Sequence, residues 1–332
     1  MTLTSLEVCA GAGGQALGLE RAGFHHVALV ENDYHACATL RLNRPFWNTI
    51  LADLRTFDGR PYRESKLPNG RSARINLLSG GVPCPPFSKA GRQLGKDDER
   101  DLFPEMIRLA EEVDPDAVLI ENVRGLLDPA FDGYRADIAA AFGDLGFKLP
   151  EQPFRLLAAS DFGVPQLRPR TAFVALKPEF IQHFQWPVGS RFGTPTVGDA
   201  LHAMMAERGW PGADDWRDRA DRIAPTLVGG SKLHGGPDLG PTRARRAWEA
   251  LGVNGKLLAA APPDAAFPVD GLPSLTVPMA AAIQGFPPEW QFAGSKTHAY
   301  RQVGNAFPPP VAASLGSRIA AALKAARGSG HD

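Results

Sequence analysis

The stretch LEVCAGAGGQALGLERAGFHHVALVE, residues 6–31, decides the fold class. Its first apolar run, Leu6 to Cys9, is typical of a buried strand and leads into a glycine-rich turn. A helical pattern follows from Gln15 to Ala22, and a second apolar run extends from Val27 to Glu31. Strand, turn, helix and strand in this order predict a βαβ unit with parallel strands.

The same alternation continues to about residue 177. It predicts further strands at Asn76 to Ser79, Ala117 to Glu121, Phe154 to Ala158 and Thr171 to Leu176, and further helices at His35 to Leu42, Leu102 to Val113 and Tyr134 to Leu145. Turn signals then replace periodicity until about residue 295, and a helical pattern returns from Val311 to Ala326. We therefore predict an α/β fold: a doubly wound, mostly parallel sheet in residues 1–177 plus 296–332, and a smaller, irregular domain in 178–295. The last helix should pack on the first domain.

Length and composition exclude several protein classes. The 332 residues suggest about two domains. Because 36 Lys and Arg balance 36 Asp and Glu, a uniformly basic surface for nucleic acid is excluded, and any polyanion must meet a local patch. Cys9, Cys37 and Cys84 form no C-x-x-C pair, which argues against a disulfide framework and a zinc ribbon. With no signal-like start and no membrane-length apolar run, we expect a soluble, cytoplasmic protein without a metal.

The glycine turn predicts a ligand that approaches the backbone at a helix N-terminus. Gly11 to Gly14 follow the first strand, and Glu31 ends the second, where a carboxylate can accept hydrogen bonds from both hydroxyls of a ribose. Asp53, after the run Thr49 to Ala52, is suited to bind a base amino group. The same residues fit the dinucleotide fingerprint, so an NAD-dependent dehydrogenase is an alternative interpretation.

Cys84 lies in GGVPCPPFS, residues 80–88, just after a predicted strand. The prolines fix the backbone, the glycines let a substrate approach, and no apolar periodicity would bury the thiol, so this pattern predicts a nucleophile. Glu121 ends the next predicted strand and should face the same crevice, because parallel strands end at one edge. In QLRPR, Arg168 and Arg170 occupy alternate positions, and we expect both guanidinium groups on one face, suited to a phosphate or a carbonyl oxygen.

These segments, in this order, resemble the DNA cytosine-5 methyltransferases of the bacterial restriction-modification type. Five blocks between residues 9 and 310 carry the resemblance: CAGAGG, GGVPCPPFS, ENV, QLRPR and YRQVGNAFPPP. The resemblance implies a Rossmann-like, S-adenosylmethionine-dependent methyltransferase domain and a target-recognition domain. It also implies methyl transfer to C5 of a flipped-out cytosine in a specific double-stranded DNA sequence, with a cognate restriction endonuclease as a further partner. We expect a monomer.

The resemblance also assigns residue roles. Cys84 is the nucleophile that adds to C6, Glu121 the acid that protonates N3, and Arg170 the donor to O2, with Arg168 supporting Arg170 and the phosphate backbone. The residues expected around S-adenosylmethionine are Ala10, Gly11, Gly13, Gly14, Glu31, Asn32, Asp53, Leu54, Pro83, Leu102 and Asn305. Those expected to contact DNA are Ser88, Lys89, Arg92, Thr226, Lys232, Arg243, Arg245 and Arg246. The segment Gly91 to Arg100 is expected to close over the flipped base as a lid.

DNA binding requires a basic patch. The sequence predicts it between Arg222 and Lys256, a range that contains six basic residues and two acidic ones. Three positions depart from the family pattern: Cys9 stands where Phe is usual, Asn32 where an aromatic residue is frequent, and Pro85 where Gln is common. Two alternatives stay open. One is a tRNA cytosine-5 methyltransferase of the same fold, and the other is a catalytically inactive DNA-binding module.

Overall fold

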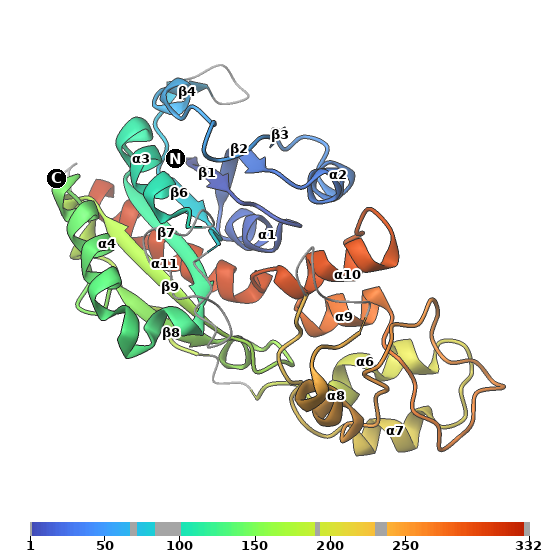
Figure 1. The fold of residues 1–332 in the computed structure, drawn as a ribbon. Helices are drawn as coiled ribbons and strands as arrows, with labels where there is room; N and C mark the ends of the chain where they lie inside the picture. Colours follow the sequence, from blue (N-terminus) through green and yellow to red (C-terminus); the bar gives the residue numbers. More distant parts are fainter. Residues whose placement is uncertain (1, 67–71, 84–100, 190–192, 230–237, 329–332) are drawn as a thin grey trace. The chain divides into compact units, whose positions relative to one another are not determined.

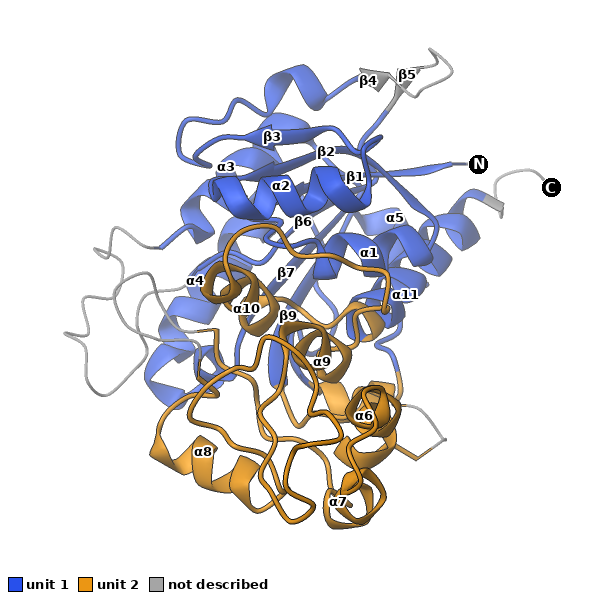
Figure 2. Ribbon diagram, turned by 90° about the vertical axis from the view of Figure 1, so that its right-hand side faces the viewer, with its two compact units in different colours: residues 1–157, 169–187, 311–332 blue, residues 158–168, 188–310 orange. Residues whose placement is uncertain are grey.

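The computed structural model describes residues 2–66, 72–83, 101–189, 193–229 and 238–328. The chain forms two compact units, shown in Figure 2: unit 1 comprises residues 1–157, 169–187 and 311–332, and unit 2 comprises 158–168 and 188–310. Residues 158–168 and 296–310 thus group with unit 2, although the sequence analysis placed them in the first domain. The roles assigned to the two domains stay predictions.

Unit 1 is built on a seven-stranded sheet with the strand order β3-β2-β1-β6-β7-β9-β8 (Figure 1). Its strands are β1 (Leu3–Val8), β2 (Phe24–Glu31), β3 (Thr49–Leu51), β6 (Leu77–Gly80), β7 (Ala117–Val123), β8 (Phe154–Ala158) and β9 (Pro169–Leu176). The neighbouring strands β3, β2, β1, β6 and β7 pair in parallel, whereas β9 runs antiparallel to β7. The predicted doubly wound, mostly parallel sheet is confirmed. A separate pair, β4 (Ser65–Lys66) and β5 (Ser72–Ala73), was not predicted.

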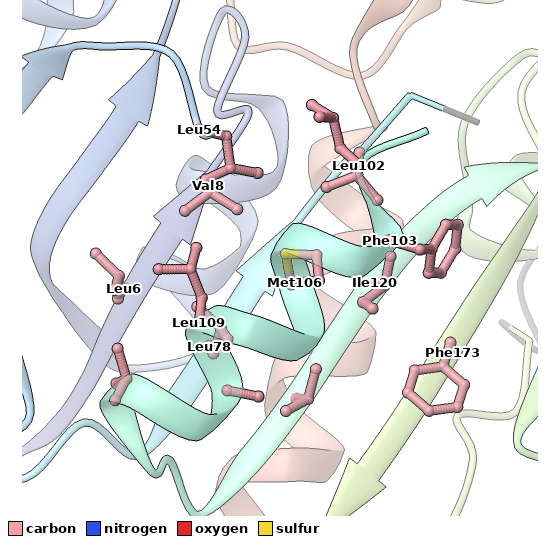
Figure 3. Close-up of a cluster of buried hydrophobic side chains, with 14 of the residues drawn as sticks. Leu6, Val8, Leu54, Leu78, Leu102, Phe103, Met106, Leu109, Ile120 and Phe173 are labelled. Carbon is pink, nitrogen blue, oxygen red and sulfur yellow. The ribbon is translucent and has the colours of Figure 1, made fainter. Parts of the chain in front are cut away.

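One face of the sheet is covered by α3 (Phe103–Val113) and α4 (Asp132–Asp144). The buried residues of α3 recur at three- and four-residue spacing, which gives the helix one apolar stripe: Phe103, Met106, Leu109, Ala110 and Val113. Figure 3 shows this stripe against alternate residues of the strands, among them Leu6, Val8, Leu78, Ile120 and Phe173. The stripe therefore fixes α3 along the middle of the sheet.

The helices α1 (Gly14–Arg21) and α11 (Pro309–Gly328) pack against each other in unit 1. A Cβ on Gly316 of α11 would lie 2.8 Å from the Ala22 Cβ and 2.8 Å from Leu19 Cδ2. This contact confirms that the C-terminal helix returns to the first domain. The other helices in the described part of unit 1 are α2 (Tyr34–Asn43), α5 (Pro178–Ile181), η1 (Arg60–Tyr62), η3 (Arg124–Leu127) and η4 (Pro129–Phe131).

Unit 2 consists of short helices joined by irregular segments, and tryptophans lie in its core among aliphatic side chains. The helices are η5 (Ala159–Phe162), α6 (Val197–Ala206), α7 (Ala213–Arg219), α8 (Thr242–Glu249), α9 (Val277–Ile283) and α10 (Lys296–Asn305). Trp210, Trp216 and Trp248 are buried, and Trp216 Nε1 donates a hydrogen bond to the carbonyl of Gly252 at 3.0 Å. Large aromatic side chains thus build a core in a segment with little periodic structure.

We predict that Gly316→Ala destabilises unit 1 by about 1–3 kcal/mol, although Ala favours helices over Gly by about 1 kcal/mol, because the new methyl group overlaps α1. Gly143→Ala is the matched control, since Gly143 in α4 has open space around its missing Cβ and should gain stability. Urea unfolding followed by circular dichroism measures both free energies. Equal stabilisation by the two substitutions would contradict the close packing of α11.

Candidate active site

The glycine turn after β1 has an unusual backbone. Cys9, Gly11 and Gly13 have φ values of 50°, 53° and 84°, in the left-handed region where glycine is favoured. A Cβ added to Gly11 would meet no atom within 4 Å, so space is open beside this backbone. Burial raises the pKa of the Cys9 thiol, which argues against Cys9 as a nucleophile.

Glu31, at the end of β2, holds the glycine turn from the neighbouring strand. Its Oε2 accepts a hydrogen bond from the Gly11 N–H at 2.7 Å, and its Oε1 accepts from the N–H groups of Asn32 and Asp33, each at 2.8 Å. Burial raises the pKa of this carboxyl, and the three backbone donors oppose that rise. A carboxylate has about four acceptor sites, so one further donor can be bound while these three bonds persist. The sequence predicted that this carboxylate accepts hydrogen bonds from both hydroxyls of a ribose, whereas these three bonds leave it a site for one.

Asp53 lies two residues beyond β3, at the same edge of the sheet as Glu31, because Leu51 pairs with Glu31 in parallel register. Its Oδ1 accepts from the Arg55 N–H at 2.9 Å, and its Oδ2 pairs with Arg55 Nη1 at 3.1 Å. The next residue, Leu54, is buried in the hydrophobic cluster under α3. The structure thus brings two carboxylates beside the glycine turn: Glu31, which is buried, and Asp53, which is half-buried.

Glu121 and Arg170 form an ion pair between β7 and β9, with 3.0 Å between Glu121 Oε1 and Arg170 Nε. Arg170 pairs with Val123 in the antiparallel register, so its side chain is diagonal to that of Glu121 on one face of the sheet. Both side chains are largely buried, at 11% and 14% exposure. Burial lowers the pKa of Arg170, and the nearby Glu121 carboxylate opposes that shift.

The backbone that leads to Cys84 passes beside Glu121. A Cβ on Gly81 would lie 3.2 Å from Glu121 Oε2, and Asn122 Nδ2 donates to the carbonyl of Val82 at 3.0 Å. The carbonyl of Pro83 in turn accepts from the N–H of Leu102 at 3.4 Å. Cys84, Ser88, Lys89 and Arg92, the segment 91–100 and Lys232 lie outside the described residues.

Arg168 differs from its predicted role. Its side chain has no exposed surface, and its guanidinium donates to the carbonyls of Leu227 at 2.9 Å and of Gly304 and Ala306 at 2.8 Å each. A side chain enclosed in this way cannot reach a DNA phosphate, so the predicted phosphate contact is wrong for this conformation. Arg168 instead joins three segments of unit 2, whereas Arg170 binds Glu121 within unit 1.

Sequence reasoning missed Gln166 and Gln284, which complete the network around Arg168. The Gln166 side chain accepts from the Leu227 N–H at 2.8 Å and donates to Gln284 Oε1 at 2.7 Å. Gln166 and Arg168 therefore hold the N–H and the carbonyl of Leu227, the residue after Thr226. The sequence offered no signal for Gln166, because its partners Leu227 and Gln284 lie 61 and 118 residues away along the chain.

Other predicted residues lie in unit 2 as follows. Thr226 is half-buried, and Asn305 is exposed at the end of α10. Arg243 and Arg246 are exposed on α8, whereas Arg245 packs against Gly255. The side chain of Trp248 anchors α8 in the core of unit 2 and leaves Arg243 and Arg246 at its surface.

The described residues contain no group of three or more His, Cys, Asp or Glu side chains that could hold a metal ion. None of the described helices is long and apolar enough to cross a membrane.

Comparison with known proteins places this chain in a family. The model of the C-5 cytosine-specific DNA methylases matches residues 3–321. The chain is 53% identical to the Type II methyltransferase M.NgoMIV of Neisseria gonorrhoeae, with 98% of this chain and 99% of the relative covered. It is 51% identical to the Type II methyltransferase M.NaeI of Lentzea aerocolonigenes, with 100% of this chain and 78% of the relative covered. The structure of the Entamoeba histolytica methyltransferase EhMeth has a TM-score of 0.65 at 15% identity, over 96% of this chain and 98% of that one.

The chain therefore belongs to the C-5 cytosine-specific DNA methylases. It is a DNA (cytosine-5)-methyltransferase with a Rossmann-like catalytic fold, as the sequence analysis predicted. This identification excludes the NAD-dependent dehydrogenase.

We predict that Arg168→Met destabilises unit 2 by about 2–5 kcal/mol, because three buried carbonyls lose a charged donor. Arg243→Met, which removes an exposed arginine from α8, should change stability by less than about 0.5 kcal/mol. Chemical denaturation of both variants followed by tryptophan fluorescence makes the comparison. If Arg168→Met proved as stable as Arg243→Met, the structural role of Arg168 would be refuted.

Proposed function

We propose that this enzyme transfers a methyl group from S-adenosylmethionine to C5 of a flipped-out cytosine in a specific double-stranded DNA sequence, through a covalent bond between Cys84 and C6. The observation that carries the proposal is the Glu121 and Arg170 ion pair beside the backbone that enters Cys84. Addition to a cytosine ring needs a nucleophile for C6, an acid that protonates N3, and a cation that holds the acid and the base in place.

The residues at the glycine turn fit S-adenosylmethionine. Open space beside Gly11 lets a ligand reach the backbone, Glu31 retains an acceptor site for a ribose hydroxyl, and Asp53 offers a carboxylate for the adenine amino group. When bound, S-adenosylmethionine supplies an electrophilic methyl group that C5 takes up. The other residues proposed around it are Ala10, Gly13, Gly14, Asn32, Leu54, Pro83, Leu102 and Asn305.

The protein's own groups make C5 reactive. The Cys84 thiolate forms a bond to C6, the electron pair of the C5–C6 double bond shifts to form a C4–C5 double bond, and the pair of the C4–N3 double bond moves onto N3, which takes a proton from Glu121. C5 thereby becomes the nucleophilic carbon of an enamine. Arg170 holds the Glu121 carboxyl in place and donates to O2 of the base. After methylation, the C5 proton passes to water, its electron pair restores the C5–C6 double bond, and the Cys84 thiolate leaves. The proton on N3 returns to Glu121.

Access to C6 requires that the cytosine leave the helix, because C6 is stacked in B-DNA and unstacking costs a few kcal/mol. Contacts to the phosphates can offset this cost. Arg243 and Arg246, exposed on α8, are described residues suited to that role, and Lys232 is proposed with them. A DNA substrate is favoured over a tRNA because the matching family and the Type II relatives are DNA methyltransferases.

The same relatives support a role in a Type II restriction-modification system. We infer that methylation by this enzyme protects a specific sequence from a cognate endonuclease. Plasmid DNA from cells that express the enzyme should therefore carry 5-methylcytosine at one sequence, which bisulfite sequencing identifies.

We predict that a duplex with 5-fluorocytosine at that position traps the wild-type enzyme in a complex that survives denaturation, because C5 has no proton to lose after methylation. Cys84→Ala should form no such complex, while Cys37→Ala, which changes a buried thiol, should trap like the wild type. Denaturing gel electrophoresis after incubation with S-adenosylmethionine measures the complex. Trapping by Cys84→Ala would overturn the assignment of the nucleophile.

A further inference from the structure

Arg108 in α3 contacts the loop that follows β3. Its Nη2 donates to the carbonyl of Leu54 at 2.9 Å and to that of Phe57 at 3.1 Å. These carbonyls lie at the two ends of a turn that the Phe57 N–H closes by donating to the Leu54 carbonyl at 3.3 Å. One guanidinium nitrogen thus fixes the turn immediately after Asp53.

Two glutamates on the same face of α3 hold Arg108 in this position. Its Nε donates to Glu105 Oε2 and its Nη1 donates to Glu112 Oε1, each at 2.7 Å. The spacing of three and four residues places all three side chains side by side on the helix. Because Nε and Nη1 are bound to the two glutamates, Nη2 is directed at the loop that follows β3.

Glu112 ties down the far end of the same loop. Its Oε2 accepts from the Gly59 N–H at 2.7 Å. A Cβ on Gly59 would lie 2.8 Å from Leu109 Cδ2 and 3.0 Å from Val113 Cγ2, so glycine lets the loop approach α3 without displacing these side chains. The loop from Asp53 to Gly59 is therefore held to α3 by polar contacts at both ends.

The orientation of Asp53 depends on this loop. Leu54 and Phe57 are buried in the cluster under α3, whereas the Asp53 side chain is 43% exposed. The contacts that the structure gives its carboxylate come from Arg55, a residue of the same loop. A shift of the loop would thus move the carboxylate relative to Glu31 and the glycine turn.

We infer that Arg108 is a positioning residue for the adenosine end of S-adenosylmethionine. It acts through the loop from Asp53 to Gly59, which it holds in the position that presents the Asp53 carboxylate to the adenine amino group. The inference rests on the proposed role of Asp53. Glu112 shares the role because it binds both Arg108 and the Gly59 N–H.

The test measures binding of S-adenosylhomocysteine to the full chain by calorimetry. Arg108→Met should raise its Kd about five- to twenty-fold, since coupled neighbours typically interact on this scale. Glu112→Gln should weaken binding less, because the amide oxygen still accepts from Gly59. Glu111→Gln is the matched control: it makes the same change on an exposed residue of α3 and should leave the Kd unchanged.

A double-mutant cycle with Asp53→Ala locates the effect. If Arg108 acts through Asp53, Arg108→Met should weaken binding in the wild-type background and have little further effect in Asp53→Ala. Equal losses in both backgrounds would overturn the inference. An unchanged Kd for Asp53→Ala alone would instead overturn the placement of the adenine at Asp53, which is a failure of the proposed function.

Kinetics separate positioning from general damage to the fold. Arg108→Met should raise KM for S-adenosylmethionine while kcat and KM for DNA change less than about twofold. Arg108→Lys keeps the charge and one donor to the loop, so it should recover part of the affinity and remain folded if Arg108→Met does not. Equal rises of both KM values in Arg108→Lys would contradict the inference.

Discussion

The ion pair between Glu121 and Arg170 is the interaction on which the candidate active site depends. Each charge is largely removed from water, so each requires the other, and removing one partner from a buried pair typically costs about 3–5 kcal/mol. The pair exists because β9 runs antiparallel to β7, which places the first residues of β9 beside the last residues of β7. A parallel β9 would put Arg170 at the opposite edge of the sheet.

The parallel strands then place the remaining groups at the same edge. β1, β2, β6 and β7 all end there: the glycine turn follows β1, Gly81 follows β6, Glu31 is the last residue of β2, and Glu121 lies near the end of β7. The apolar stripe of α3 packs against the same sheet. Leu102, which precedes α3, donates a hydrogen bond from its N–H to the carbonyl of Pro83. One helix therefore contacts both the loop with Asp53 and the backbone that enters Cys84, which links the proposed cofactor and cytosine sites within unit 1.

The sequence predicted the parts of this arrangement that depend on periodicity. Apolar runs located the strands, and the three- and four-residue spacing located α3. Glu31 and Glu121, in the last residues of β2 and β7, were found because a polar side chain at the end of an apolar run is visible in a single sequence. Their roles toward a ligand stay predictions.

The sequence did not predict the partners that the tertiary structure supplies. Alternation predicted both guanidinium groups on one face, but it could not show that three carbonyls from distant segments enclose Arg168. Arg168 precedes β9, whereas Arg170 lies in it and pairs with Glu121. Gln166 was missed for the same reason, since its partners lie 61 and 118 residues away. Arg108 was not singled out by the sequence, because the loop that it binds is 51 to 54 residues earlier in the chain.

The central claim is that Glu121, held by Arg170, acts on the cytosine ring and not on binding. Single-turnover methylation by Glu121→Gln, with saturating S-adenosylmethionine and DNA, tests it most directly. Glutamine keeps the shape and an oxygen for Arg170 but delivers no proton, so the rate should fall by about 10²–10⁴-fold while both Kd values stay within about threefold. A single-turnover rate close to that of the wild type would show that another group protonates N3 and would contradict this account.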